Sequence, residues 1–334
     1  FLTATKEDIQ NLVSFREGEV KLGEKVQVIG DGGSLKDNSA KFVMIGTPED
    51  IGVRANGGVG GAHTIWPQAL KALLNVQDTN MLHGEEILVL GAFDFTEEMN
   101  ASETMDVVEL RNIVSTIDDA VFPVIRQIAE AGKIPIVIGG GHNNAYPILK
   151  GVSLAINKPL NCINLDAHSD YRRMEGRHSG NGFRYAHREG YLCKYEVVGL
   201  HENYNAQDIL DELKDDPDLH FSFYEDIFIR EKLSYYEAVR NAIDRAYGKP
   251  TGIEIDVDCI ENVLSSAMTP CGISTVHARQ YISWCARSLH PAYLHIAEGA
   301  ATLRDGRTSA TNAKLIAYLV TDFIKAHQNR DRHK

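Results

Sequence analysis

Short apolar runs alternate with longer amphipathic segments along most of the chain. Eight runs are rich in β-branched residues and almost continuously apolar, which is typical of strands covered on both faces. They lie at residues 42–46, 86–94, 134–141, 161–167, 195–200, 219–224, 251–258 and 292–299. Between them, residues 104–131, 232–247 and 311–327 repeat apolar positions three and four apart, as helices that bury one face do.

This alternation predicts an α/β fold. Because strands that alternate with helices form parallel sheets, we expect an eight-stranded parallel sheet with helices on both faces, a three-layer α/β/α sandwich. No linker rich in proline, glycine or serine divides the chain, so residues 41–334 are predicted to form a single domain. Residues 1–40 are polar and are predicted to be an N-terminal extension that lies over this domain.

The composition argues against several classes of protein. The 334 residues are 43% hydrophobic and 24% charged, a globular composition with enough apolar mass for a large core. A net charge of −12 argues against binding to nucleic acid or to an anionic membrane surface. No run of about 18 apolar residues is present that could span a membrane. Five cysteines without CxxC spacing predict unbridged thiols in a reduced, cytoplasmic setting.

Residues with metal-binding chemistry follow three of the predicted strands. The segments are GGGHNNAYP after the third run, NLDAHSDYR at the fourth and EIDVDCIE at the seventh. Because loops at the carboxyl edge of a parallel sheet converge, we expect their side chains to meet. Residues two apart on a strand point the same way, roughly 6–7 Å apart, so each segment is predicted to present its ligands to one side. The candidate ligands are His142, Asp166, His168, Asp170, Asp256 and Asp258.

This density of carboxylates predicts bound cations. An apolar strand end does not tolerate four aspartates unless positive charge neutralises them, and two divalent ions supply four charges. Two histidines and four aspartates form a hard, oxygen-rich set that suits Mn²⁺ or a similar octahedral ion better than structural zinc, which favours thiolates. Taken alone, a DxD segment is also typical of a helix cap and GGGH of a tight turn. The three segments together favour a metal site.

The three segments resemble the signatures of the ureohydrolase family, which includes arginase, agmatinase and formiminoglutamase. The likeness runs from about residue 42 to the C-terminal helix and implies an arginase-like catalytic domain with two Mn²⁺ ions per chain. It also implies a homo-oligomer, a trimer or a hexamer. By this resemblance one ion is held by His142, Asp166, Asp170 and Asp256. The other is held by Asp166, His168, Asp256 and Asp258, with Asp166 and Asp256 bridging the ions.

Within the family the chain is most similar to formiminoglutamase. The segments GGGHNNAY, DAHSDYR, HSGNGFRYA and GVRANGGVGGA carry this likeness. It implies hydrolysis of N-formimino-L-glutamate to L-glutamate and formamide, a step of histidine degradation, by a hydroxide that bridges the two ions. Asp170 or Asp258 is the candidate to relay a proton to the leaving amine. Glu298 is the candidate to orient the amidine nitrogens of the substrate.

The loop at residues 171–190 is locally basic in an acidic protein. It contains Arg172, Arg173, Arg177, Arg184 and Arg188 against two glutamates. Guanidinium groups match carboxylate geometry, so this excess suits a carboxylate-bearing substrate; a solvated loop that pairs with the acidic surface is the alternative. Arg172, helped by Arg184, is predicted to hold a substrate carboxylate. Ser179 and Asn181 are predicted to add neutral hydrogen bonds.

Several positions depart from the family patterns, among them Asn143, where formiminoglutamases usually carry glutamate, and the residues after DVD. Phe183 stands where arginases have a histidine, which leaves His178 or His187 as substitutes for a proton shuttle. The motif of the last strand reads AEGAA, which keeps Glu298 but lacks the usual asparagine and proline. An arginase, agmatinase or other guanidine hydrolase that releases urea is the enzymatic alternative. A non-catalytic family member is the alternative from a different class.

Overall fold

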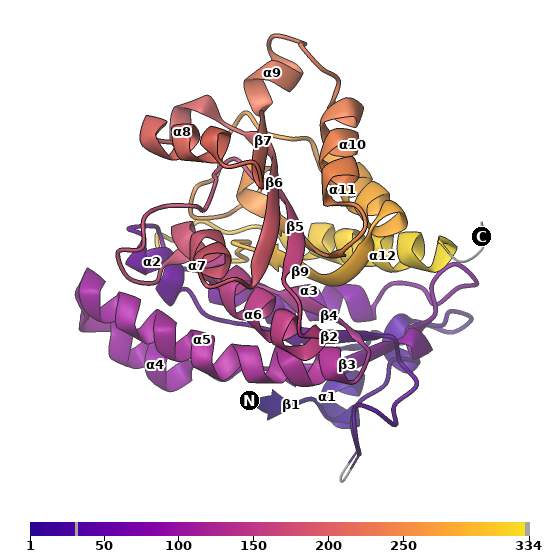
Figure 1. Cartoon of the computed structure of the whole chain (residues 1–334). Helices are drawn as coiled ribbons and strands as arrows, with labels where there is room; N and C mark the ends of the chain where they lie inside the picture. The colour runs from indigo at the N-terminus through magenta and orange to yellow at the C-terminus, as the bar shows by residue number, and fades with distance from the viewer. Residues whose placement is uncertain (31–32, 331–334) are drawn as a thin grey trace.

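The fold was obtained as a computed structural model, in which residues 1–30 and 33–330 are described. Within these residues one sheet has nine strands in the order β1-β3-β2-β4-β9-β8-β5-β6-β7 (Figure 1). All neighbours pair in parallel except β1 and β3. The strands are β1 Leu2–Thr3, β2 Phe42–Gly46, β3 Ile87–Ala92, β4 Ile134–Ile138, β5 Leu160–Leu165, β6 Leu192–Leu200, β7 Leu219–Phe223, β8 Pro250–Asp256 and β9 His290–Ala297.

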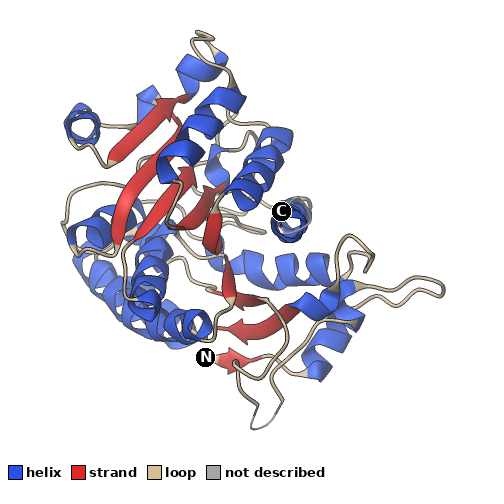
Figure 2. Ribbon diagram, turned by 45° about the vertical axis from the view of Figure 1, so that its right-hand side comes forward, coloured by secondary structure: helices blue, strands red, loops and turns tan. Residues whose placement is uncertain are grey.

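Helices cover both faces of the sheet, so the molecule has three layers (Figure 2). One apolar cluster joins the sheet to α3, α10, α11 and α12, and a second joins the opposite face to α5, α6, α7 and α8. The helices are α1 Lys6–Leu12, α2 Ile51–Ala55, α3 Ile65–Leu74, α4 Thr96–Ala101, α5 Val107–Glu130, α6 Ala145–Ile156, α7 Gly182–Arg188, α8 Gln207–Asp215, α9 Tyr224–Phe228, α10 Tyr235–Ala246, α11 Thr275–Ser288 and α12 Asn312–Asn329. Among the described residues, no helix has both the length and the apolar character needed to cross a membrane.

Local sequence explains where the longest helix begins and which face it buries. Asp106 accepts a hydrogen bond from the backbone N–H of Glu109, and the Glu109 side chain accepts one from the backbone N–H of Asp106, so α5 begins with a capping box. The buried residues Leu110, Val114 and Val121 follow at helical spacing and pack against the sheet.

The predicted three-layer fold is confirmed, with eight parallel strands at the predicted runs. The ninth strand, β1, was not predicted; it pairs antiparallel with β3 at the edge of the sheet. Residues 1–40 thus include one strand of the sheet as well as α1, which contacts α3. The division of the chain at residue 40 stays a prediction.

Six strands end earlier than predicted, and two of them precede or carry the aspartate segments. Strand β5 ends at Leu165 and β8 at Asp256, so the prediction that the ligands of DAHSD and DVD alternate along strands is wrong. Residues 166–170 form an irregular loop in which Asp166 Oδ1 accepts a hydrogen bond of 2.7 Å from the backbone N–H of His168. The loop, rather than strand alternation, aims these side chains, because the chain turns as soon as it leaves the sheet.

Candidate metal centre and substrate cleft

The candidate site lies at the carboxyl ends of the four strands in the middle of the sheet, β4, β9, β8 and β5. His142 begins a 3-10 turn that follows β4, Asp256 is the last residue of β8, and Asp258 lies in the next turn. Asp166, His168 and Asp170 follow β5, and Glu298 follows β9. The predicted convergence of these segments is therefore present, because the parallel strands end at one edge.

Four of the predicted ligands form a first group: His142, Asp166, Asp170 and Asp256. His142 Nδ1 lies 2.9 Å from Oδ2 of Asp170, 3.2 Å from Oδ2 of Asp166 and 3.3 Å from Oδ2 of Asp256. All four residues are buried. One ring nitrogen thus faces three carboxylate oxygens, and these ligand atoms lie within 4.8 Å of one another.

Asp166, His168 and Asp258 form a second group next to the first. His168 Nδ1 lies 3.2 Å from Oδ2 of Asp258 and 3.5 Å from Oδ1 of Asp166. Asp166 therefore turns Oδ2 toward the first group and Oδ1 toward the second, as a bridging ligand would. Asp256, for which the sequence also predicts bridging, belongs to the first group by these distances.

The backbone is strained at two of the candidate site residues. Asp170 has a φ of 44° and Glu298 a φ of 64°, in the left-handed region that costs a non-glycine residue about 1–3 kcal/mol. Glu298 Oε1 accepts a hydrogen bond of 3.0 Å from the backbone N–H of His142, which ties the end of β9 to the turn after β4. Strain that is held in place by the surrounding structure is typical of functional sites.

A buried glutamate supports the turn that carries His142. Glu49 accepts hydrogen bonds from the backbone N–H groups of Gly141 and Gly52, at 3.0 and 3.1 Å, and from the side chain of Asn144 at 2.7 Å. Sequence reasoning missed Glu49. The available signal was a pair of acidic residues in TPED, directly after an apolar strand.

Burial and crowding shift the pKa values of the carboxyl groups. Burial and repulsion from Asp166 raise the pKa of Asp170 to about 6. Burial and repulsion from Asp258 raise the pKa of Asp256 well above its usual value and that of Glu298 to about 8. Repulsion among these carboxyl groups therefore favours the binding of positive charge between them.

The donor set fits hard divalent cations. Within the described residues, the fully buried His142 Nδ1 and Asp258 Oδ1 make no aligned hydrogen bond. Buried polar atoms require partners, and oxygen-rich ligands with two imidazoles match Mn²⁺ or a similar ion. Two such ions would supply the charge that the aspartates lack.

A cleft of about 430 Å³ opens above the two ligand groups. Asp170, Asp258 and Glu298 lie in its wall, together with two of the predicted substrate-binding residues, Arg172 and Ser179. A neighbouring hollow of about 340 Å³ shares Ser169, Arg172, Tyr204 and Asn205 with the cleft. The two spaces together extend from the ligand groups toward α8.

Comparison with known proteins identifies the family. The sequence profile of the arginase family matches residues 40–321. The chain belongs to the arginase family. A formimidoylglutamase of Streptococcus pyogenes is 29% identical over 228 residues, which cover 65% of this chain and 64% of that protein. The match thus spans less than two thirds of that relative.

Solved structures share the arginase fold. Bacillus subtilis formimidoylglutamase has a TM-score of 0.74 at 18% identity, covering 94% of both chains. Trypanosoma cruzi formiminoglutamase, crystallised with Mn²⁺, has a TM-score of 0.71 at 20% identity, covering 93% of this chain and 99% of that chain. The resemblance that the sequence motifs indicate is confirmed at the level of family and fold.

The other two predicted substrate-binding residues of this arginase-family chain do not line the cleft. Asn181 is fully buried; its side chain donates to the carbonyl of Gly176 at 2.8 Å and accepts from Arg177 at 2.7 Å. Arg184 donates to both carboxylate oxygens of Glu212, at 2.9 and 2.6 Å. Both side chains use their polar groups to hold the 171–190 loop in place.

The other arginines of this loop also have acidic partners. Arg177 pairs with the buried Asp118 at 2.8 Å, and Arg188 pairs with Glu212 at 2.6 Å. The exposed Arg173 pairs with Asp208 at 2.7 Å. Most arginines of the loop therefore pair with acidic residues, as the alternative interpretation predicts. Arg172 is the arginine of the loop that lies in the wall of the cleft.

Phe183, at the position of the arginase histidine, and the two candidate substitutes, His178 and His187, also lie outside the wall of the cleft. Phe183 is fully buried, and its ring contacts that of His142 edge-on with the ring centres 5.1 Å apart. His187 Nδ1 lies 2.6 Å from the hydroxyl of Tyr171. His178 is buried in the turn before Ser179 and accepts a hydrogen bond of 3.1 Å from the backbone N–H of Gly180.

Proposed function

We propose that this arginase-family chain hydrolyses the C–N bond of a linear amidine, with N-formimino-L-glutamate as substrate and L-glutamate and formamide as products. The observation that carries the proposal is the pair of ligand groups that share Asp166 below a cleft with Arg172 in its wall. The named relatives in Streptococcus pyogenes and Bacillus subtilis support the choice of substrate. The proposal includes the predicted cytoplasmic location and the trimer or hexamer.

Two Mn²⁺ ions per chain are part of this proposal. The residues that would hold one ion are His142, Asp166, Asp170 and Asp256. His168 and Asp258, with Asp166 and a contribution from Asp256, would hold the other. Ions in these positions would lower the pKa of a shared water molecule toward ~7 and so provide a nucleophile at neutral pH.

Three carboxylates in the wall of the cleft are proposed to act on the substrate. Asp258 has one buried oxygen without a hydrogen-bond partner among the described residues, and Asp170 also lies in the wall of the cleft. Either carboxylate is proposed to pass a proton to the leaving amine. Glu298 is proposed to accept hydrogen bonds from the amidine nitrogens, because its Oε2 is not used by the backbone N–H of His142.

Arg172 is proposed to bind a carboxylate of the substrate. Its guanidinium group donates to Oδ1 of Asn56 at 2.8 Å and to Glu175 at 3.3 Å, and its side chain is 54% exposed. Asn56 holds one edge of the group, and the exposed Glu175 contact can give way to a substrate carboxylate. A dicarboxylate suits this cation better than agmatine, which carries positive charge alone. Ser179, beside Asn56, is proposed to add a hydrogen bond.

A substrate panel with the Mn²⁺-loaded protein tests the proposed function. Formamide, glutamate and urea are measured after incubation with N-formimino-L-glutamate, L-arginine and agmatine. We expect formamide and glutamate in equal amounts from the first, with a kcat/KM at least ~100-fold above those of the guanidines. Asp170→Asn should abolish this turnover. Asp244→Asn, which removes the same charge on the surface of α10, should leave it unchanged.

Two results would contradict the proposal. Urea from arginine at the higher kcat/KM would identify a guanidine hydrolase. Two bound ions without turnover of any substrate in the panel would favour a non-catalytic family member.

A further inference from the structure

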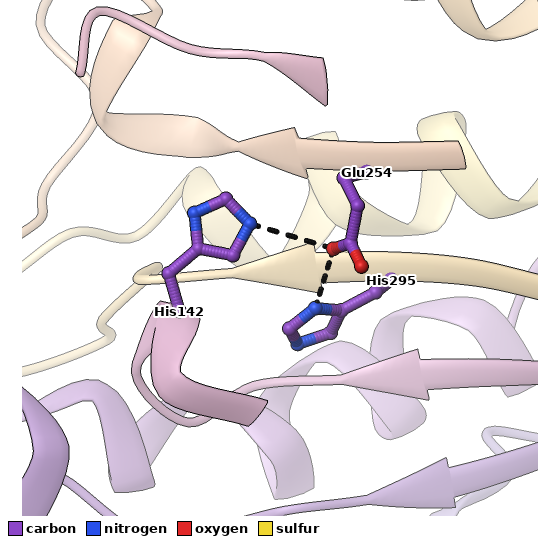
Figure 3. A group of neighbouring side chains, drawn as sticks. All are labelled: His142, Glu254 and His295. Atoms are coloured by element: carbon purple, nitrogen blue, oxygen red, sulfur yellow. Dashed lines mark hydrogen bonds and ion pairs between the residues drawn. The ribbon is translucent and has the colours of Figure 1, made fainter. Parts of the chain in front are cut away.

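The buried carboxylate of Glu254 lies between two histidines, the candidate ligand His142 and His295 (Figure 3). Glu254 Oε2 is 2.6 Å from Nδ1 of His295 and 3.4 Å from Nε2 of His142. Glu254 Oε1 accepts a hydrogen bond of 2.7 Å from the hydroxyl of Tyr293. All four side chains are fully buried. A carboxylate in this position requires donors on both oxygens, and Tyr293 and His295 provide them.

The strand register places this carboxylate under the ligand. Glu254 and His295 are direct partners in the pairing of β8 with β9. Glu254 precedes the candidate ligand Asp256 by two residues, and His142 approaches from the turn after β4, the other neighbour of β9. Three adjacent strands thus bring the two histidines to the same carboxylate.

The two nitrogens of His142 face different surroundings. Nδ1 faces the oxygens of Asp166, Asp170 and Asp256, whereas Nε2 faces Glu254. Neutral imidazole carries one proton, and the nitrogen that binds a metal ion must be the unprotonated one. Nε2 has no aligned hydrogen-bond partner among the described residues, and Glu254 is the carboxylate within reach of it.

We propose that Glu254 is a positioning residue that receives the Nε2–H of His142 and so presents Nδ1 to the first ion. His295 and Tyr293 hold the Glu254 carboxylate in the orientation that this contact needs. Because histidine ligands depend on the acceptor of their second nitrogen, the ring of His142 would otherwise rotate or bind in the wrong tautomer. This inference rests on the metal centre of the proposed function and goes beyond it.

Glu254 is less suited to be a ligand itself. Two ligand atoms on one octahedral ion with bonds of about 2.1 Å lie about 3 Å apart. Glu254 Oε2 and His295 Nδ1 are closer, at 2.6 Å, which is the length of a short hydrogen bond. A third ion would also require His142 to lose both ring protons. The distances therefore favour a hydrogen-bonded support over a third metal site.

Mn²⁺ binding to Glu254→Gln tests this role. Free Mn²⁺ is measured by electron paramagnetic resonance during titration of the wild type, of Glu254→Gln and of Glu196→Gln. Glu196 is an equally buried glutamate on β6 that pairs with Arg245 and serves as the matched control. We expect Glu254→Gln to lower the affinity for one of the two Mn²⁺ ions about 10–100-fold and to leave the affinity for the other unchanged. Glu196→Gln should bind both ions as the wild type does.

A second measurement needs no substitution at Glu254. In ¹⁵N-histidine-labelled wild-type protein loaded with Zn²⁺, nitrogen–proton correlation spectra should place the proton of His142 on Nε2. His142→Gln assigns the signal. A proton on Nδ1, or unchanged affinity for both Mn²⁺ ions in Glu254→Gln, would overturn the inference. Three tightly bound Mn²⁺ ions per chain would overturn it in favour of a ligand role. Failure of the wild type to bind two ions would instead contradict the proposed function.

Discussion

Single side chains at the cleft divide into those that face it and those that hold the loops in place. Arg172 and Arg188 illustrate the difference within one loop. Both are about half exposed, with 54% and 52% of the side chain accessible, and both contact an acidic partner. Arg172 also lies in the wall of the cleft, whereas Arg188 contacts Glu212 outside it. Position, rather than charge or exposure, is the reason that a substrate role is proposed for Arg172 and not for Arg188.

Arg172→Met should weaken substrate binding more than it slows the chemical step. A charge-assisted hydrogen bond to a substrate carboxylate contributes about 1.5–3 kcal/mol, so kcat/KM for N-formimino-L-glutamate should fall about 10–150-fold. Most of the change should be a higher KM in steady-state assays. Arg188→Met, the matched control, should change KM less than about 2-fold. A fall in kcat with an unchanged KM would contradict the assigned role.

His178 is held in its neutral form by its surroundings. Burial, followed by the positive charges of Arg111, Arg172 and Arg177, lowers the pKa of His178 to about 3, although Glu175 lies 3.3 Å from its Nε2. Neutral His178 accepts a hydrogen bond from the turn that carries Ser179. A histidine that stays neutral and lies outside the cleft is a structural part of the loop and a poor substitute for the arginase proton shuttle.

The protein should lose stability at acid pH through His178. Its pKa in the unfolded chain is about 6.5, so the folded state binds fewer protons than the unfolded state between pH 6.5 and 3. The stabilisation is complete above pH 6.5 and falls as pH decreases, by about 2 kcal/mol between pH 7 and 5. Urea unfolding of His178→Asn and wild type at both pH values checks this, since the variant lacks this loss. If the unfolding free energies of the wild type and of His178→Asn differed by the same amount at pH 7 and pH 5, this role of His178 would be contradicted.

At the scale of elements, the sequence was informative wherever burial imposes a pattern. The eight parallel strands are continuously apolar because helices cover both faces, so they could be predicted together with α5, α10 and α12. Strand β1 could not, because its two residues carry no pattern and its place depends on a close backbone approach at Gly91.

The candidate site could be predicted in part for the same reason. The six candidate ligands stand out as polar residues at the ends of apolar runs. Glu49 and Glu254 do not, because a buried support residue has no motif spacing of its own; the sign of Glu254 was a charge within the apolar run TGIEIDVD. The partners of Asn181 and Arg184 could not be predicted either, since Gly176 lies within an irregular loop and Glu212 in a distant helix.

Gly91→Ala should detach β1 while leaving the metal centre intact. Gly91 has a φ of 136°, and a Cβ there would lie 2.0 Å from the carbonyl oxygen of Leu2. We expect a lower melting temperature and fast hydrogen exchange at residues 2–4, with unchanged Mn²⁺ stoichiometry. Gly132→Ala is the matched control, because Gly132 also has a positive φ, 73°, but no atom within 4 Å of the added Cβ. Slow exchange at residues 2–4 in Gly91→Ala would contradict the role of this close approach.

At the scale of the whole molecule, the sheet concentrates negative charge at its centre. The four middle strands bring four aspartates and Glu298 together at one edge of the sheet in a protein whose net charge is −12. Burial keeps water from screening this repulsion, so folding without cations is opposed at the site where the strands converge. Metal binding and folding should therefore be coupled.

Mn²⁺ should raise the thermal stability of the whole chain, and EDTA should lower it. A ligand at 100 times its Kd stabilises the folded state by about 2.7 kcal/mol, so two ions contribute about 5 kcal/mol under such conditions. For a chain of 334 residues the entropy of unfolding is about 0.7 kcal/mol/K, so each kcal/mol raises the melting temperature by about 1.4 °C, which predicts a rise of about 7 °C by calorimetry. Asp166→Asn, which removes charge from the ligand shared by both groups, should lose most of this rise. Glu196→Gln should keep the full rise even where its own melting temperature differs, because Glu196 lies on β6 and pairs with Arg245. Equal melting curves of the wild type with Mn²⁺ and with EDTA would show that the clustered aspartates are accommodated without ions, and the metal centre would then have to be abandoned.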